Sequence, residues 1–166
     1  MSNRTHSNQI RAGLYTPEER ARRDATIWTP VQGILAPLQF LVFLVSLGFV
    51  IRYLWTGNGY ELAAWSIVIK TLVLYVIMVT GAIWEKVVFG QYLLAPAFFW
   101  EDVFSFLVIA LHTAYLWALF TGALAPVPLM WLALAAYATY VINAVQFILK
   151  LRAARLQAAA FEGVHA

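Results

Sequence analysis

The sequence predicts an all-α integral membrane protein with four transmembrane helices, both termini in the cytoplasm and a short N-terminal surface helix. Of its 166 residues, 63% are hydrophobic and 11% are charged, whereas soluble domains are about 25% charged. A helix of about 20 apolar residues spans the hydrocarbon core of a bilayer, and the chain holds four such runs. Lysines and arginines gather beside these runs, as topology signals do.

Three parts follow from the composition: a polar and basic cytoplasmic segment over 1–30, a four-helix transmembrane domain over 31–150 and a cytoplasmic tail over 151–166. Within the first part, Thr16 and Glu19 have the spacing of a capping box, and Pro17 suits the first helical position. We therefore expect a short amphipathic surface helix from about Pro17 to Thr26.

The four spans are expected at about Val31 to Leu54, from about Glu61 past Trp84, from near Pro96 to near Phe120, and at about Leu129 to Leu149. Glycine and asparagine mark a turn in WTGNGY, and TGALAPVP is the second turn. Between the second and third spans, Gly90 and Pro96 interrupt an apolar stretch. This stretch is predicted to be an interfacial or re-entrant connection rather than a fifth span.

The distribution of positive charge predicts the orientation. Placing the N-terminus in the cytoplasm puts nine of the 11 basic residues inside, namely Arg4, Arg11, Arg20, Arg22, Arg23, Lys86, Lys150, Arg152 and Arg155. Arg52 lies just before the first outer turn, and Lys70 lies within a span. This asymmetry favours both termini inside.

The sequence argues against several classes of function. The chain has no cysteine, which excludes disulfides, thiolate metal sites and cysteine nucleophiles. It carries no phosphate loop, dinucleotide fingerprint, HExxH motif or nucleophile elbow. The sequence pI of 9.3 indicates contacts with membrane lipid rather than with nucleic acid, because the basic residues flank apolar spans.

The strongest candidate site lies between the second and third spans, where Glu85, Lys86, Glu101 and Asp102 interrupt apolar sequence. Carboxylates in lipid surroundings are costly and usually face a protein interior or a water-filled cavity. Two structural alternatives stay open. Glu85 and Lys86 are also compatible with a solvated helix end, and Glu101 and Asp102 with an acidic first turn favoured by the helix dipole.

Further polar residues lie inside the spans: Lys70, Ser105, His112, Asn143 and Gln146. Glu101, Ser105 and His112 share one face of the third helix. Eleven residues, about 16 Å along the axis, separate Glu101 from His112, which is comparable with the breadth of a large flat ligand. A structural role is the alternative for each: hydrogen bonding across helices for His112, pairing or snorkelling for Lys70, and packing for Asn143 and Gln146.

The sequence also resembles a known family. The segments YTPEERARRD, IWTPVQGILAPLQFLVFLVSL, IKTLVLY, IMVTGAIWEKVVFGQYLLAPAFFWEDVFS and ALHTAYL resemble the 2-vinyl (3-vinyl) bacteriochlorophyllide hydratases of phototrophic bacteria. The resemblance covers roughly Tyr15 to Arg155 and is most specific from Gly81 to Leu116. It implies a multi-pass enzyme of the bacterial inner, photosynthetic membrane. It also implies hydration of the C3-vinyl group of chlorophyllide a or 3-vinyl bacteriochlorophyllide to a 1-hydroxyethyl group, on the route to bacteriochlorophyll a.

This chemistry fits the candidate residues and needs no cofactor and no metal of the protein's own. Two carboxyl groups in different environments divide the acid and base roles. We expect Glu85 and Glu101 to be this pair, with Asp102 supporting or replacing one of them. His112 is a possible axial ligand of the substrate's magnesium or a donor to its periphery, and Lys70 or Lys86 is expected to meet its propionate. Ser105, Asn143 and Gln146 complete the predicted substrate-binding set.

Two other functions compete with the hydratase. A non-catalytic tetrapyrrole-binding or assembly protein of the photosynthetic membrane would bind pigment without forming product. Ion or proton transport is weaker, because four short spans without repeats or broken helices make a poor transporter. A homo-oligomer or a complex with other pigment-biosynthesis enzymes is compatible with either reading.

Overall fold

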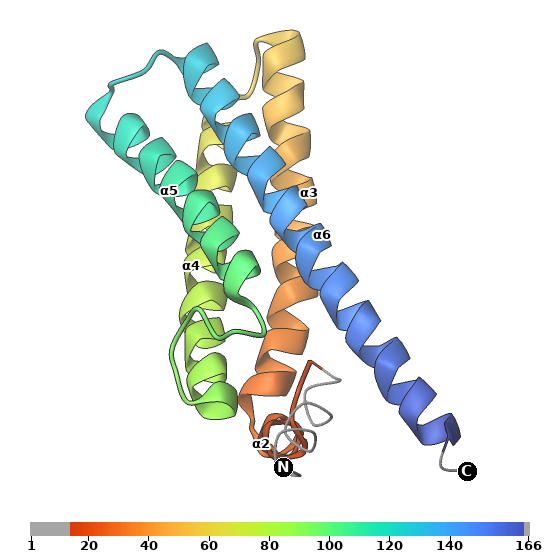
Figure 1. Cartoon of the computed structure of the whole chain (residues 1–166). Helices are drawn as coiled ribbons and strands as arrows, with labels where there is room; N and C mark the ends of the chain where they lie inside the picture. The colour runs from red at the N-terminus through yellow and green to blue at the C-terminus, as the bar shows by residue number, and fades with distance from the viewer. Residues whose placement is uncertain (1–13, 165–166) are drawn as a thin grey trace.

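A computed structural model describes residues 14–164, with side chains to Leu156, and shows five helices in that part of the chain. They are α2 (Pro17–Ala25), α3 (Trp28–Thr56), α4 (Tyr60–Phe89), α5 (Phe99–Thr121) and α6 (Pro126–Val164) (Figure 1). Four of the described helices, α3 to α6, are long and apolar enough to cross a membrane. The chain is therefore a multi-pass membrane protein with an all-helical fold.

The four spans form where the sequence predicts them, and their ends differ by a few residues. The third begins at Phe99 rather than near Pro96, because a turn closed by Phe98 N–H and the Ala95 carbonyl (2.8 Å) precedes it. The helix of the fourth span continues through the expected charged stop to Val164. Alanine, leucine, lysine and arginine dominate that stretch, and all four favour helix.

The bundle consists of two antiparallel hairpins, α3 with α4 and α5 with α6, which pack against each other along their inner faces (Figure 1). Gly57 and Gly122 end α3 and α5 in the left-handed region, with φ of 71° and 66°, where glycine has no steric penalty. The core between the hairpins contains Val50, Ile67, Tyr115, Met130 and Ala133, all buried. Large apolar side chains also cover the outward faces, as lipid contact requires.

The predicted capping box is present at the start of α2. Thr16 Oγ1 accepts a hydrogen bond from the Glu19 N–H (3.2 Å), and the Glu19 carboxylate accepts one from the Thr16 N–H (2.8 Å). The helix has no buried residue and packs against α4. Its position on a membrane surface stays a prediction.

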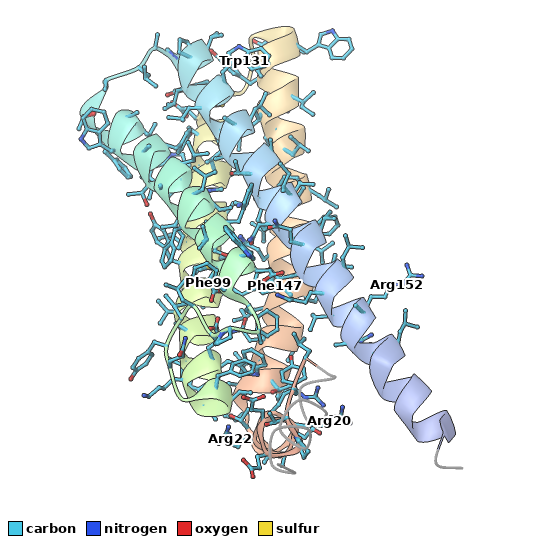
Figure 2. All side chains as sticks on the ribbon, in the orientation of Figure 1. Arg20, Arg22, Phe99, Trp131, Phe147 and Arg152 are labelled. Atoms are coloured by element: carbon cyan, nitrogen blue, oxygen red, sulfur yellow. The ribbon has the colours of Figure 1, made fainter. Side chains whose placement is uncertain are left out.

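Basic side chains gather at one end of the bundle. We call this the loop end: α2 and the loop of residues 90–98 lie there, and the C-terminal part of α6 extends past it, away from the other helices (Figure 1). Arg20, Arg22 and Arg152 lie at this end, and Trp131 lies at the opposite end (Figure 2). Arg4 and Arg11, which the orientation prediction also uses, lie outside the described residues. The location of the loop end in the cytoplasm remains an expectation.

Candidate active site

Two carboxyl groups meet at the loop end of the bundle. Glu85 lies one turn before the end of α4, and Asp102 lies in the first turn of α5. The loop of residues 90–98 joins these helices and covers both side chains, and the two carboxyl groups are close enough to interact directly. Glu85 is 5% exposed and Asp102 is 3% exposed. Two buried carboxyl groups this close repel each other when both are ionised, and a proton on one of them removes the repulsion.

The backbone of the connecting loop covers both carboxyl groups. The Leu94 N–H donates to Asp102 Oδ2 at 2.7 Å, and the Ala95 N–H donates to Glu85 Oε2 at 3.4 Å. Leu94 has a φ of 59° and is the described non-glycine residue with positive φ. Such a conformation is uncommon for leucine and costs free energy. The strained residue thus supplies the shorter of the two bonds.

Glu101 faces another partner, which corrects the expected pairing of Glu85 with Glu101. The Lys150 ammonium of α6 donates to Glu101 Oε2 at 2.6 Å and lies 5.3 Å from the centre of the Phe98 ring. Successive residues of a helix point about 100° apart. Asp102 is therefore directed toward α4, and Glu101 toward α6.

Ser105 and Asn143 support the start of α5. Asn143 Nδ2 donates to the Glu101 carbonyl at 2.9 Å, and Ser105 Oγ lies 2.8 Å from the same carbonyl and 3.3 Å from Asn143 Oδ1. Asn143 therefore fixes α6 against the turn that carries the acidic residues. Gln146 lies one turn further along α6, and its buried Oε1 has no hydrogen-bond partner among the described residues.

Lys70 and His112 form a separate pair in the middle of the bundle. Both side chains are 0% exposed, and Lys70 Nζ lies 2.7 Å from His112 Nε2. The Val108 carbonyl lies 2.7 Å from His112 Nδ1 and can only accept, so the proton of a neutral ring is on Nδ1. The Lys70 nitrogen also lies 4.0 Å from the centre of the Tyr140 ring and 5.3 Å from that of Tyr137.

In this structure, Lys70 and His112, both expected to bind substrate, already have protein partners. Both ring nitrogens of His112 are already hydrogen-bonded, which leaves no lone pair for a magnesium ion. Lys70 is enclosed by its histidine partner and two aromatic rings, so it presents no atom to a propionate. Among the described residues, no group of three or more histidine, aspartate or glutamate side chains has the arrangement of a metal site.

Lys86 is exposed at the end of α4, and it is the predicted propionate partner that stays accessible. Its ammonium donates to the Gly90 carbonyl at 2.7 Å and lies 5.4 Å from the centre of the Tyr92 ring. The hydrogen bond satisfies a carbonyl at the helix C-terminus, where a positive charge is favourable. Lys86 directly follows Glu85 along the sequence, so a substrate carboxylate near it would lie at the loop end.

An aromatic cluster flanks the acidic pair. It contains Tyr15, Trp84, Phe89, Phe98 and Phe147. Tyr15 stacks on Phe89 with ring centres 5.8 Å apart, and Phe98 stacks on Phe147 at the same distance. Figure 2 shows Phe147 on α6 near the start of α5. Flat aromatic faces of this kind suit contact with a planar macrocycle.

Tyr15 and Leu94 are the two features of this site that sequence reasoning missed. Tyr15 precedes α2 and is 8% exposed, with the Arg23 guanidinium 4.8 Å above its ring. Burial raises the pKa of the Tyr15 hydroxyl, and the positive charge of Arg23 opposes this shift. The capping box predicted the start of α2 correctly, but it did not indicate that Tyr15 is buried next to this helix. No residue pattern signals the left-handed backbone of Leu94.

Comparison with known proteins identifies the family. The family model of 2-vinyl bacteriochlorophyllide hydratase (BCHF) matches residues 15–153. A 2-vinyl bacteriochlorophyllide hydratase of Rhodobacter capsulatus is 76% identical over 152 residues, covering 92% of this chain and 88% of the relative. One of Cereibacter sphaeroides is 77% identical over 144 residues, covering 86% of this chain and 89% of the relative. No solved structure matches. The chain therefore belongs to the 2-vinyl bacteriochlorophyllide hydratase family and is a hydratase, a hydro-lyase.

Proposed function

We propose that this hydratase adds water to the C3-vinyl group of chlorophyllide a or 3-vinyl bacteriochlorophyllide and forms the 3-(1-hydroxyethyl) product. The reaction belongs to bacteriochlorophyll a biosynthesis, and we place it at the cytoplasmic side of the bacterial inner membrane. The names of the two relatives support a vinyl bacteriochlorophyllide as the substrate class. The buried pair of Glu85 and Asp102, which accept hydrogen bonds from one loop beside an aromatic cluster, is the observation that carries the mechanism.

The reaction needs one acid and one base. The protonated carboxyl group gives its proton to the terminal vinyl carbon, which leaves a cation on the carbon attached to the macrocycle. Water adds to this carbon through its oxygen, and a carboxylate takes the released proton. Such acid–base assistance contributes typically 10²–10⁴-fold, and a neighbouring carboxylate also stabilises the cation.

The contact between the two carboxyl groups explains how the enzyme resets. Hydration consumes no net proton, because the proton given to the vinyl carbon equals the one released by water. After one turnover, the proton is on the carboxyl group that acted as the base. Because Glu85 and Asp102 are neighbours, the proton returns directly from one carboxyl group to the other. Two carboxyl groups that lay apart would need a separate route for this return.

Substrate placement follows from the surroundings of the pair. The macrocycle packs against the aromatic cluster of Tyr15, Trp84, Phe89, Phe98 and Phe147, and the exposed Lys86 attracts the propionate. Both carboxyl groups are buried, so the loop of residues 90–98 has to shift when the vinyl group reaches them. Ser105 and Asn143 hold the start of α5 from the opposite side.

The test is product formation by the purified protein in nanodiscs. Vinyl chlorophyllide is supplied in water labelled with ¹⁸O, and we expect a blue-shifted pigment that carries one labelled oxygen. Glu85→Gln is expected to lose this product while pigment binding stays measurable. Glu61→Gln is the matched control, because Glu61 is an exposed carboxylate at the opposite end of the same helix. Equal turnover by Glu85→Gln and Glu61→Gln would remove Glu85 from the mechanism.

A further inference from the structure

We infer that Glu85 is the proton-carrying member of the pair, that Asp102 is the ionised member, and that Leu94 is the positioning residue that sets this division through its backbone N–H. This assignment rests on the proposed function, which leaves the two roles undivided. It follows from the two backbone hydrogen bonds, the conformation of Leu94 and the charges around the pair.

The lengths of the two backbone bonds distinguish the carboxyl groups. Asp102 accepts the Leu94 N–H at 2.7 Å, whereas Glu85 accepts the Ala95 N–H at 3.4 Å. Hydrogen bonds to an ionised acceptor are short, and bonds near 3.4 Å are weak. A backbone N–H can only donate, so a short bond of this kind favours the negative form of its acceptor. The loop therefore stabilises the charge on Asp102 and leaves the proton with Glu85.

The conformation of Leu94 makes this bond a specific feature of the loop. A φ of 59° is sterically unfavourable for leucine and raises its free energy, whereas glycine adopts this φ without that penalty. The side chain of Leu94 is 37% exposed, so its packing does not account for the strained backbone. The hydrogen bond to Asp102 is the contact that the conformation provides. Backbone strain that a neighbouring contact maintains is characteristic of functional sites.

The surrounding charges allow the same division. Lys150 and Glu101 lie next to Asp102, and these two charges neutralise each other through their ion pair. On α4, Glu85 is followed one turn later by the buried Val88, which belongs to the same apolar cluster as Phe98. An apolar environment favours the neutral carboxylic acid. Glu85 is thus placed as the acid that protonates the vinyl carbon, and Asp102 as the base that accepts the proton of water.

Infrared spectroscopy tests the assignment without any pigment. The reconstituted protein at neutral pH is expected to show the C=O stretch of a buried protonated carboxyl group, which shifts on exchange into heavy water. Glu85→Gln should remove this band, and Asp102→Asn should keep it. The reverse pattern, or no such band in the unsubstituted protein, overturns the assignment. Because this measurement needs no turnover, it stands apart from a failure of the proposed hydration.

Substitutions in the loop test the role of Leu94. A β-branched residue tolerates positive φ least, whereas asparagine adopts it readily. Leu94→Val should lower kcat about tenfold with little change in KM, because it displaces the group that orients the base. Leu94→Asn should recover most of the loss. Leu93→Val makes the same side-chain change one residue earlier, where φ is not positive, and serves as the control.

Two results contradict this role. Equal kcat values for Leu94→Val and Leu93→Val would show that the left-handed backbone at residue 94 does not matter. A loss in Leu94→Asn as large as that in Leu94→Val would assign the effect to the leucine side chain. If Leu94→Val does not fold, the comparison of Leu94→Asn with the unsubstituted protein, together with the infrared bands, still decides between these outcomes.

Discussion

The bundle contains two buried pairs of ionisable side chains, and they differ in what surrounds them. Glu85 and Asp102 lie at the loop end under a loop backbone, whose N–H groups donate to both carboxyl groups. Lys70 lies fifteen residues from Glu85 along α4, about 22 Å away, and its partner His112 lies on α5. Their nitrogens are satisfied by each other, by a carbonyl and by aromatic rings.

The difference shows that burial of an ionisable group inside a membrane helix is not enough to assign a catalytic role to that group. Such residues are rare, and by default they indicate function. The pair of Lys70 and His112 instead resembles a complete hydrogen-bond network, which fixes the arrangement of helices. The acidic pair differs because a short loop, rather than a second layer of helices, separates it from its surroundings. The predictions below start from this contrast.

The largest effect is expected from Asp102→Asn compared with Glu101→Gln. The first substitution removes one of the two groups that transfer protons, and we expect kcat to fall by about 10²-fold or more. The second removes a carboxylate that is paired with Lys150, and its effect on kcat should be clearly smaller. Hydration of vinyl chlorophyllide, followed by absorbance, measures both. A larger loss from Glu101→Gln would restore Glu101 as the catalytic partner of Glu85.

The next effect concerns stability at the middle of the bundle. Leaving a buried polar group unpaired costs about 1–3 kcal/mol, and more for a charged group, whereas replacing both partners by apolar residues is much less costly. His112→Leu should therefore lower the Tm more than the double variant Lys70→Met with His112→Leu. Thermal unfolding in detergent tests this order.

Turnover separates the two pairs in the same experiment. Per folded molecule, the variants at Lys70 and His112 should hydrate pigment at close to the unsubstituted rate and bind it with unchanged affinity. A loss of pigment affinity in His112→Leu, with the Tm preserved, would show that His112 contributes to substrate binding. The two pairs would then no longer differ in function.

The smallest effect is expected at the ion pair of Lys150 and Glu101. Lys150 is partly exposed, and exposed ion pairs contribute about 0.2–1 kcal/mol. Lys150→Met should lower the Tm slightly, and Lys150→Arg should retain most of the stability. The same thermal unfolding assay measures this change. A shift as large as that of His112→Leu would mean that the pair of Lys150 and Glu101 holds α6 on the bundle.

The sequence was sufficient for the helices because their signals are local. Runs of apolar residues placed all four spans, and the spacing of Thr16 and Glu19 placed the cap of α2. The same reasoning selected Glu85, Glu101 and Asp102 as candidate catalytic residues. It did not find which carboxyl groups meet, because a rotation of about 100° on α5 decides between Glu101 and Asp102.

Other features depend on the tertiary structure alone. The contact of Tyr15 with Phe89 joins residues from two separate elements. The enclosure of Lys70 requires rings from α6 to lie over a nitrogen from α4. The left-handed backbone of Leu94 follows from the way the loop closes over Asp102. Residue types and their spacing along the chain carry none of this information.

The arrangement in two hairpins has a consequence for how the enzyme matures. Glu85 belongs to the first hairpin and Asp102 to the second, so neither hairpin alone contains both members of the pair. On the proposed mechanism, a chain still being synthesised, with only α3 and α4 inserted in the bilayer, contains the acid but lacks the base. The proposed mechanism therefore requires the second hairpin to dock before hydration can begin.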